Sequence, residues 1–341
     1  MALPKHPIPT NDPQGLNHLN ANLGHLSTTL DGSLEDITRL DAATRRSLSE
    51  TAALLLDMSR IYPGVNLTVV HQTEIAAAPF NGNPWAWLRG RIRAGNFAGI
   101  NVGDFIPLAI NGNTYNMEIA GINTYERYGS PVVPRHIDLI SRELWPDPIQ
   151  YNLANYNNGI TAMTTPFLAS HINAFINSLQ ADVPNATTLN PALASVDFRS
   201  GGILSRIPAE ARAVIVPKVV LMARRHSATV LLTDDNSWDW RTMGDLWLPS
   251  EIEVAGHTVW GSTTSGLHGF GAGGYVHYPL FAENMKRLKN IVGTATRASW
   301  WLVSAVGGNS TGAAFVGSSG VVSHTSATYA GVRVPVCFRI A

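Results

Sequence analysis

Residues 238–254 read Trp-Asp-Trp-Arg-Thr-Met-Gly-Asp-Leu-Trp-Leu-Pro-Ser-Glu-Ile-Glu-Val, and residues 331–340 read Gly-Val-Arg-Val-Pro-Val-Cys-Phe-Arg-Ile. The span between these two segments carries a glycine-rich tract and the pair Trp300 and Trp301. Glycine allows tight and left-handed turns, while tryptophan supplies large buried surface that can hold an irregular chain in place. This stretch therefore predicts a compact domain with little regular structure, in which loops on a rigid scaffold carry the binding function.

Three segments in a fixed order resemble a known family. They are Leu-Trp-Leu-Pro-Ser-Glu-x-Glu-Val-x-Gly from Leu246, Trp-Trp-Leu-x-Ser from Trp300, and Gly-Val-Arg-x-Pro-x-x-x-Arg-Ile from Gly331. This pattern resembles a domain of unknown function common in phages and prophages of Gram-positive bacteria. The resemblance is strong over residues 238–341, extends more weakly back to about Trp85, and covers nothing before residue 63.

That family is similar in outline to the C-type-lectin and formylglycine-generating-enzyme folds, including the variable domains of phage tropism determinants. The resemblance implies a virion protein with a lectin-like head. The likeness to formylglycine-generating enzymes implies the fold only, because those enzymes need a pair of cysteines for their chemistry and this chain has one cysteine, Cys337. The apolar neighbours of Cys337 indicate a buried strand, in which the thiol is a small core residue.

The composition excludes several classes of partner. Lys+Arg and Asp+Glu number 24 each, and only 14% of residues are charged. This balance gives no electrostatic footprint for nucleic acid or for an anionic membrane. The sequence contains no apolar run long enough to span a bilayer and no signal-peptide core, so we expect synthesis in the host cytoplasm and no membrane insertion.

The N-terminal part predicts an extended arm over residues 1–15, followed by a coiled-coil stalk over residues 16–62. In the stalk, a 3.5-residue repeat holds without interruption, which is typical of a helix that packs along a partner helix. An amphipathic helix packed on its own domain is the alternative. The apolar residues at the a and d positions, which we expect to mediate oligomerisation, are Leu16, Leu19, Leu23, Leu26, Leu30, Ile37, Leu40, Leu54, Met58 and Ile61.

Extra apolar residues at e positions, Leu34, Leu48 and Leu55, widen the seam beyond that of a two-stranded coil. A wider seam favours a trimer or a larger bundle, so we expect a homotrimer. The arm has too little apolar surface to fold alone, and we expect it to dock on other virion proteins. Pro63 and Gly64 predict the end of the helix.

From about residue 65 onward the pattern predicts an α+β unit. Asn111-Gly112 between two alternating runs predicts a β-hairpin over residues 103–120. Helices are expected over 84–94, 166–180 and 281–291, and strands over 214–223 and 229–233. The predicted organisation is a small β-rich subdomain over 63–150 and a lectin-like C-terminal head over 151–341, with a single unit over 63–341 as the alternative.

For each candidate catalytic or metal-binding site in the sequence, a purely structural role explains the residues better. Glu251 and Glu253 lie in an alternating stretch that would place both carboxylates on one face, but the family pattern favours a scaffold role for this segment. Asp234, Asp235 and Asp239 could bind calcium, but they lack the full spacing of an EF-hand loop. We therefore expect a solvated turn there and no cofactor. We therefore expect no enzymatic activity and no metal.

The order of arm, heptads and loop-rich head favours a virion protein of tail-fibre, spike or baseplate type, whose head attaches to a glycan or protein of the host surface. The alternative is a head-fibre, neck or decoration protein with a purely structural role. For attachment, the small polar and aromatic residues of the glycine-rich loops are the predicted receptor-binding set. They are His268, Phe270, Tyr275, Asn309, Ser310, Ser318, Ser319, His324, Thr325 and Tyr329.

The first test of this set replaces Phe270 and Tyr275 together by alanine. We expect host-cell attachment to be lost while the oligomer and its melting temperature stay nearly unchanged, because exposed rings bind ligand without supporting the core. Attachment is measured with labelled protein on host cells, and stability by thermal melting. Surviving attachment, or an unfolded head, would assign both rings to the core.

Overall fold

A computed structural model describes residues 13–58, 62–128, 132–153, 167–168, 170–181, 196–225, 234–257, 259–260, 276–306 and 311–341. The chain divides into two compact units, Met1–Tyr62 and Pro63–Ala341. Within the described residues, no helix is long and apolar enough to span a membrane.

The first unit contains one long helix, α1 (Pro13–Met58, 46 residues). The helix starts earlier than expected, so residues 13–15 do not belong to an extended arm; proline is favoured in the first helical turn because its missing N–H has no partner there anyway. The described part of the helix ends at Met58, and residues 59–61, which precede the expected stop at Pro63, lie outside the described residues. The side chains of Leu16, Leu54 and Met58, and all of Ile61, lie outside the described part.

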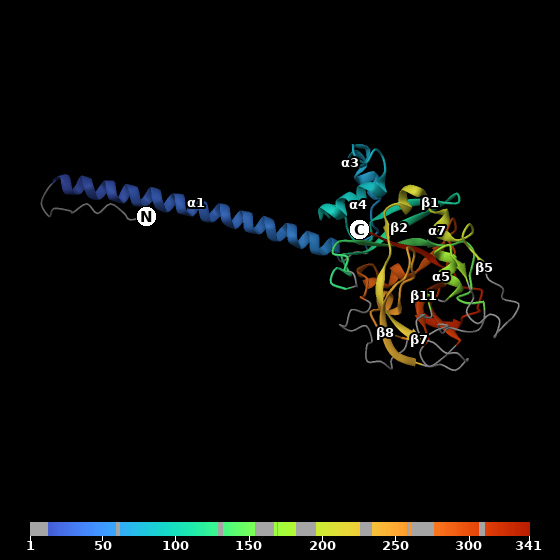
Figure 1. Cartoon of the computed structure of the whole chain (residues 1–341). Helices are drawn as coiled ribbons and strands as arrows, with labels where there is room; N and C mark the ends of the chain where they lie inside the picture. Colours follow the sequence, from blue (N-terminus) through green and yellow to red (C-terminus); the bar gives the residue numbers. More distant parts are fainter. Residues whose placement is uncertain are drawn as a thin grey trace. The chain divides into compact units, whose positions relative to one another are not determined.

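A seven-stranded sheet forms the centre of the second unit (Figure 1). Its main path runs β1 (Phe105–Ile110), β2 (Asn113–Ile122), β3 (Ile137–Leu144), β14 (Pro335–Ile340) and β6 (Ile215–Val216), with all neighbours antiparallel. At its C-terminal end, β3 also pairs in parallel with β9 (Lys289–Ile291), which pairs in turn with β10 (Arg297–Ala298). The segment 105–144 thus shares one sheet with the C-terminal strand.

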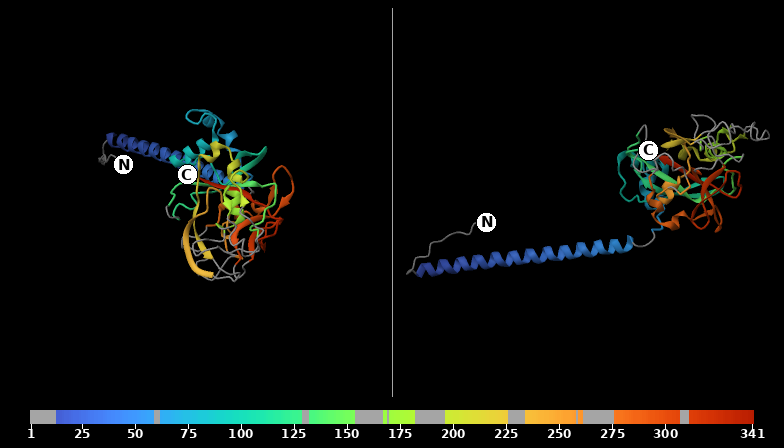
Figure 2. Two further views of the ribbon diagram at one scale, coloured as in Figure 1. Left: turned by 45° about the vertical axis from the view of Figure 1, so that its right-hand side comes forward. Right: turned by 90° about the horizontal axis from the view of Figure 1, so that it is seen from below.

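Smaller sheets and short helices surround this sheet. The sheets are β11 (Trp300–Ala305) with β12 (Gly312–Val316) and β13 (Val322–Ser326), β7 (Val219–Arg225) with β8 (Asp234–Thr242), and β4 (Gln180–Ala181) with β5 (Val196–Asp197). The helices are α2 (Leu67–Val70), α3 (Gln72–Ala76), α4 (Pro84–Ala94), α5 (His171–Ile176), α7 (Ile203–Arg206), α8 (Ala209–Arg212), α9 (Glu251–Ala255), and the 3-10 turns η1 (Pro279–Ala282) and η2 (Asn284–Arg287). The β7–β8 hairpin extends away from the central sheet (Figures 1 and 2). The protein is therefore of the mixed α+β class, as predicted.

Two local predictions are confirmed. Ile110 pairs with Asn113, and both residues of the connecting turn have positive φ, 50° at Asn111 and 76° at Gly112, as a type I′ turn requires. Helix α4 spans Pro84–Ala94 as expected. The Asn83 side chain caps its first turn, and its buried Trp85 ring meets Phe338 of β14 edge-on at 5.7 Å.

Three other predictions are wrong in type or extent. Residues 281–291 form 3-10 turns and strand β9 instead of a helix, because Asn290 and Ile291 pair with the end of β3. The helix expected over 166–180 is limited to α5, and the strand expected over 214–223 is divided into β6 and β7 around Pro217. The strand expected over 229–233 lies outside the described residues.

Gly64 provides a test of the packing at the start of the second unit. It has φ +75°, and an added Cβ would lie 1.8 Å from the Gly103 carbonyl oxygen. Gly82 has φ +87° but no heavy atom within 4 Å of an added Cβ, so it is a matched control. We expect Gly82→Ala to lower the free energy of unfolding by about 1–2 kcal/mol from backbone strain alone, and Gly64→Ala by a further 1–3 kcal/mol, roughly, from overpacking. Urea denaturation of both variants would measure this, and equal losses would contradict the close approach of Gly64 to Gly103.

Candidate functional site

The site region is built on a buried ion pair between two neighbouring strands. Asp138 of β3 lies directly opposite Arg339 of β14, and both side chains are almost fully buried. Arg339 donates from Nε to Asp138 Oδ1 at 2.7 Å and from Nη2 to Oδ2 at 2.8 Å, which is the bidentate geometry of a strong pair. Burial opposes ionisation of Asp138, but the adjacent guanidinium holds the pKa of its carboxyl well below the usual range.

A second buried pair joins the first through a tyrosine. Lys218 Nζ donates to Glu253 Oε1 and, at 3.0 Å, to Tyr278 Oη, while Tyr278 donates to Asp138 Oδ2 at 2.7 Å. Burial lowers the pKa of Lys218. Its ammonium is 3.9 Å from the centre of the Trp247 ring, so a cation–π contact supports the charge.

Glu253 links this cluster to helix α9. Its Oε1 accepts from Tyr125 Oη at 2.6 Å, and its Oε2 accepts from the backbone N–H of Ser250 at 2.7 Å. The Ser250 side chain in turn accepts from the N–H of Glu253, which completes a capping box. The segment is therefore helical, and the prediction of an alternating stretch with both glutamates on one face is wrong.

The cluster of Tyr125, Asp138, Lys218, Glu253, Tyr278 and Arg339 is closed to solvent. Its two cations balance its two carboxylates, and buried charges of this kind are tolerated because each is paired. Nothing in the sequence spacing placed these residues together, because they come from six separate segments of the chain.

The predicted binding residues fall into two groups. His268, Phe270, Tyr275, Asn309 and Ser310 lie outside the described residues. Ser318 and Ser319 are exposed in the turn between β12 and β13, His324 and Thr325 belong to β13, and Tyr329 is 53% exposed after that strand.

A tryptophan that the sequence reasoning did not select joins this second group. The Trp260 ring is 37% exposed and lies 4.2 Å from the His324 ring, centre to centre. The backbone N–H of Trp260 donates to Glu251 Oε1 at 2.7 Å, which anchors it to α9. The sequence did contain a signal for Trp260. It lies beside the glycine-rich stretch, where few apolar residues surround it in the sequence, and this could have marked it as a surface tryptophan.

Strand geometry separates two of the predicted residues. Successive side chains on a strand point to opposite faces, so Thr325 lies on the face opposite His324. Trp260, Ser318, Ser319, His324 and Tyr329 are the candidate residues for attachment among the described part of the chain, and we refer to them together as the attachment face. Thr325 is not part of it.

The described residues contain no cluster of three or more His, Cys, Asp or Glu side chains placed to hold a metal. Asp234, Asp235 and Asp239 belong to β8 rather than to a turn, and their side chains lie outside the described part. Cys337 is buried in β14, as expected, and burial raises the pKa of its thiol.

Comparison with known proteins gives one match. The model of a family described as domain of unknown function DUF6273 matches residues 144–341. No curated protein matches the chain, and no solved structure does. The matched segment contains Lys218, Glu253 and Arg339 of the buried cluster, while Asp138 precedes it.

His136, beside this cluster, makes stability depend on pH. Its ring is fully buried, with Nε2 accepting from the Tyr125 N–H at 3.0 Å and Nδ1 3.2 Å from the Val133 carbonyl, so the neutral ring protonated on Nδ1 fits the site. The pKa of His136 is lowered to about 4, mainly by burial and also by the nearby charge of Arg339. The negative charge of Asp138 acts in the opposite direction and raises the pKa. In an unfolded chain, a histidine side chain has a pKa of about 6.5.

Between these two pKa values the unfolded chain binds a proton that the folded chain does not, so stability falls as the pH drops through this window. We expect His136 to contribute a loss of up to about 3 kcal/mol. Urea denaturation at a series of pH values would measure it, and His136→Gln should reduce the slope. Buried His171, whose pKa is also lowered by burial, should leave a residual slope in both proteins. An identical pH dependence for variant and wild type would show that His136 is not responsible.

Proposed function

The chain belongs to the DUF6273 family, and on that premise we propose that it is an oligomeric phage virion protein of fibre, spike or baseplate type that attaches to the host surface through its globular unit. The observation that carries the proposal is the unburied apolar seam of α1. The resemblance of residues 238–341 to a phage domain of C-type-lectin-like outline supports it.

The seam leaves a row of large apolar side chains exposed to solvent. Its exposed members are Leu19 (37%), Leu23 (54%), Leu26 (39%), Leu30 (61%), Leu34 (64%), Ile37 (64%) and Leu40 (69%). Each such side chain stabilises an assembly by about 1.5–3 kcal/mol when fully buried. A 3.5-residue repeat matches the same repeat on another copy of this chain, so the occupant we propose for the seam is a second and a third α1.

Two polar residues at core positions fit this assembly. Ser33 Oγ donates to the Thr29 carbonyl at 2.9 Å, and Thr44 Oγ1 donates to the Leu40 carbonyl at 2.8 Å. Each hydroxyl donor therefore has a partner inside its own helix and would not be left unsatisfied in a trimer core.

The attachment face supplies the proposed contact with the host. It combines exposed serines for adaptable hydrogen bonds with the Trp260–His324 ring pair and Tyr329, a combination typical of binding surfaces. Three copies on one stalk would raise avidity for a repeated surface ligand without requiring a tight single site.

Light scattering on the full chain tests the stalk. We expect a mass three times that of the 36.7-kDa chain. Replacing Leu30 and Ile37 together by lysine should give a monomer, because charges cannot be buried in the seam. His25→Lys, at the outer c position, is the matched control and should remain a trimer. A monomeric wild-type chain would refute the stalk.

Attachment is tested with labelled trimer on host and non-host cells. We expect saturable binding to host cells only, with loss of most binding in the variant Trp260→Ala/Tyr329→Ala. The monomeric Leu30→Lys/Ile37→Lys protein should bind more weakly, because it lacks avidity. A trimer that binds no host cell would instead favour the structural role of a head-fibre, neck or decoration protein.

A further inference from the structure

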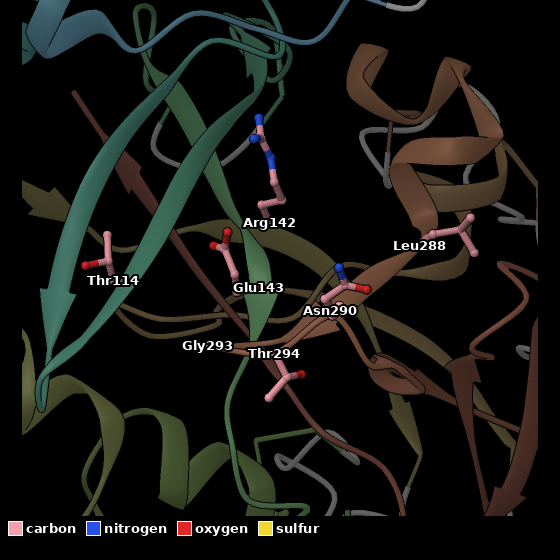
Figure 3. A pocket seen from close by; sticks show the side chains of 8 residues that line it. Thr114, Arg142, Glu143, Leu288, Asn290, Gly293 and Thr294 are labelled. Carbon is pink, nitrogen blue, oxygen red and sulfur yellow. The ribbon is translucent and has the colours of Figure 1, made fainter.

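A polar hollow opens at the edge of the central sheet. It has a volume of about 550 Å³, within the usual range of small-ligand sites. Figure 3 shows that its walls come from the β1–β2 hairpin, the end of β3 and the segment around β9. The lining residues are Thr114, Arg142, Glu143, Leu288, Asn290, Gly293, Thr294 and Ala295.

The polar groups of this hollow are held in place before any ligand arrives. Glu143 accepts from the backbone N–H and the side-chain amide of Asn116, both at 2.7 Å. Arg142 donates from Nε and Nη2 to Glu118 at 3.1 and 3.0 Å, and its guanidinium lies 4.8 Å from the centre of the Phe105 ring. Thr294 Oγ1 donates to the Ile291 carbonyl at 3.0 Å. Groups fixed on strands lose little entropy when they bind.

The charges of the lining argue against an anionic ligand. Arg142 is already paired with buried Glu118, which also accepts from Lys286 at 3.0 Å. Glu143 places a negative charge in the same hollow, so the formal charge of the lining is zero. A phosphate or carboxylate would find no unpaired cation to bind in this lining and would be repelled by the Glu143 carboxylate.

Metal and apolar ligands fit no better. Among the described residues, no three carboxylate, histidine or cysteine side chains are placed to hold a metal ion. Leu288 and Ala295 are the two purely apolar side chains of the lining, too few to hold a hydrophobic molecule. What the hollow offers is a carboxylate with lone pairs beyond the two that Asn116 uses, a side-chain amide at Asn290, and hydroxyls at Thr114 and Thr294.

We infer that this hollow is a saccharide-binding subsite. Sugar hydroxyls both donate and accept, so they match a lining that mixes carboxylate, amide and hydroxyl groups without net charge. The inference deepens the proposed attachment function and rests on it, because it names an uncharged glycan as the class of surface ligand. The hollow also lies next to the predicted binding turn: a Cβ added to Gly320 would be 3.2 Å from Leu288 Cδ2, and Gly320 shares its turn with Ser318 and Ser319.

The subsite belongs to this chain rather than to its family domain alone. Leu288 to Ala295 fall within the matched segment 144–341, whereas Thr114, Arg142 and Glu143 precede it. Selectivity among sugars would therefore depend on the β1–β2 hairpin and the end of β3.

Saturation-transfer NMR on the full chain tests the subsite. The probes are the methyl glycosides of glucose, galactose, rhamnose and N-acetylglucosamine, with sialic acid as an anionic and choline as a cationic comparison. We expect saturation of at least one neutral glycoside and none of the charged probes. In NMR titrations, Glu143→Gln and Asn290→Ala should each weaken the affinity for that glycoside by about tenfold or more. Val69→Ala, at an exposed position of α2 outside both the hollow lining and the attachment face, is the matched control and should bind it normally.

Asn290 and Thr294 are exposed, so Asn290→Ala and Thr294→Val carry the test if Glu143→Gln does not fold. Absence of saturation for every neutral glycoside, preference for a charged probe, or unchanged binding in the hollow variants would overturn the subsite. Host-cell attachment is a separate readout. Wild-type protein that binds a glycoside but no host cell would refute attachment and keep the subsite, and the reverse result would refute the subsite alone.

Discussion

The buried pair between Asp138 and Arg339 is the interaction on which the globular unit depends. A buried charge without its partner destabilises a protein by about 3–5 kcal/mol, so β3 and β14 can pair only in the register that brings these two side chains together. Tyr278 extends the constraint to Lys218, Lys218 extends it to Glu253, and Glu253 extends it to the first turn of α9. One cluster thus holds together strands and a helix that are far apart in the sequence.

This constraint also sets the boundary of the folded unit. Arg339, Lys218 and Glu253 lie within the DUF6273 segment, but Asp138 lies before it. The family segment taken by itself would leave Arg339 buried without its carboxylate and would leave β14 without its neighbour β3. Residues 105–144 are therefore part of the same fold as the family domain, and the single unit from Pro63 onward is the physically complete one.

The division between scaffold and surface follows from the same packing. Paired charges and large rings fill the interior, where Trp247, Trp300 and Trp301 are fully buried. Short polar residues and the half-exposed Trp260 occupy turns and strand edges, where changes of side chain cost little stability.

The sequence by itself determined the features that depend on nearby residues. The heptad spacing of α1, the Asn111–Gly112 hairpin, the capped helix α4 and the burial of Cys337 each follow from periodicity, turn chemistry or immediate neighbours. The tertiary structure decided the rest. Residues 289–291 became a strand because the end of β3 was available to pair, Glu253 found Lys218 across the fold, and Trp260 met His324. These outcomes depend on partners distant in sequence, and no local pattern specifies which distant side chain will neutralise a buried charge or complete a sheet.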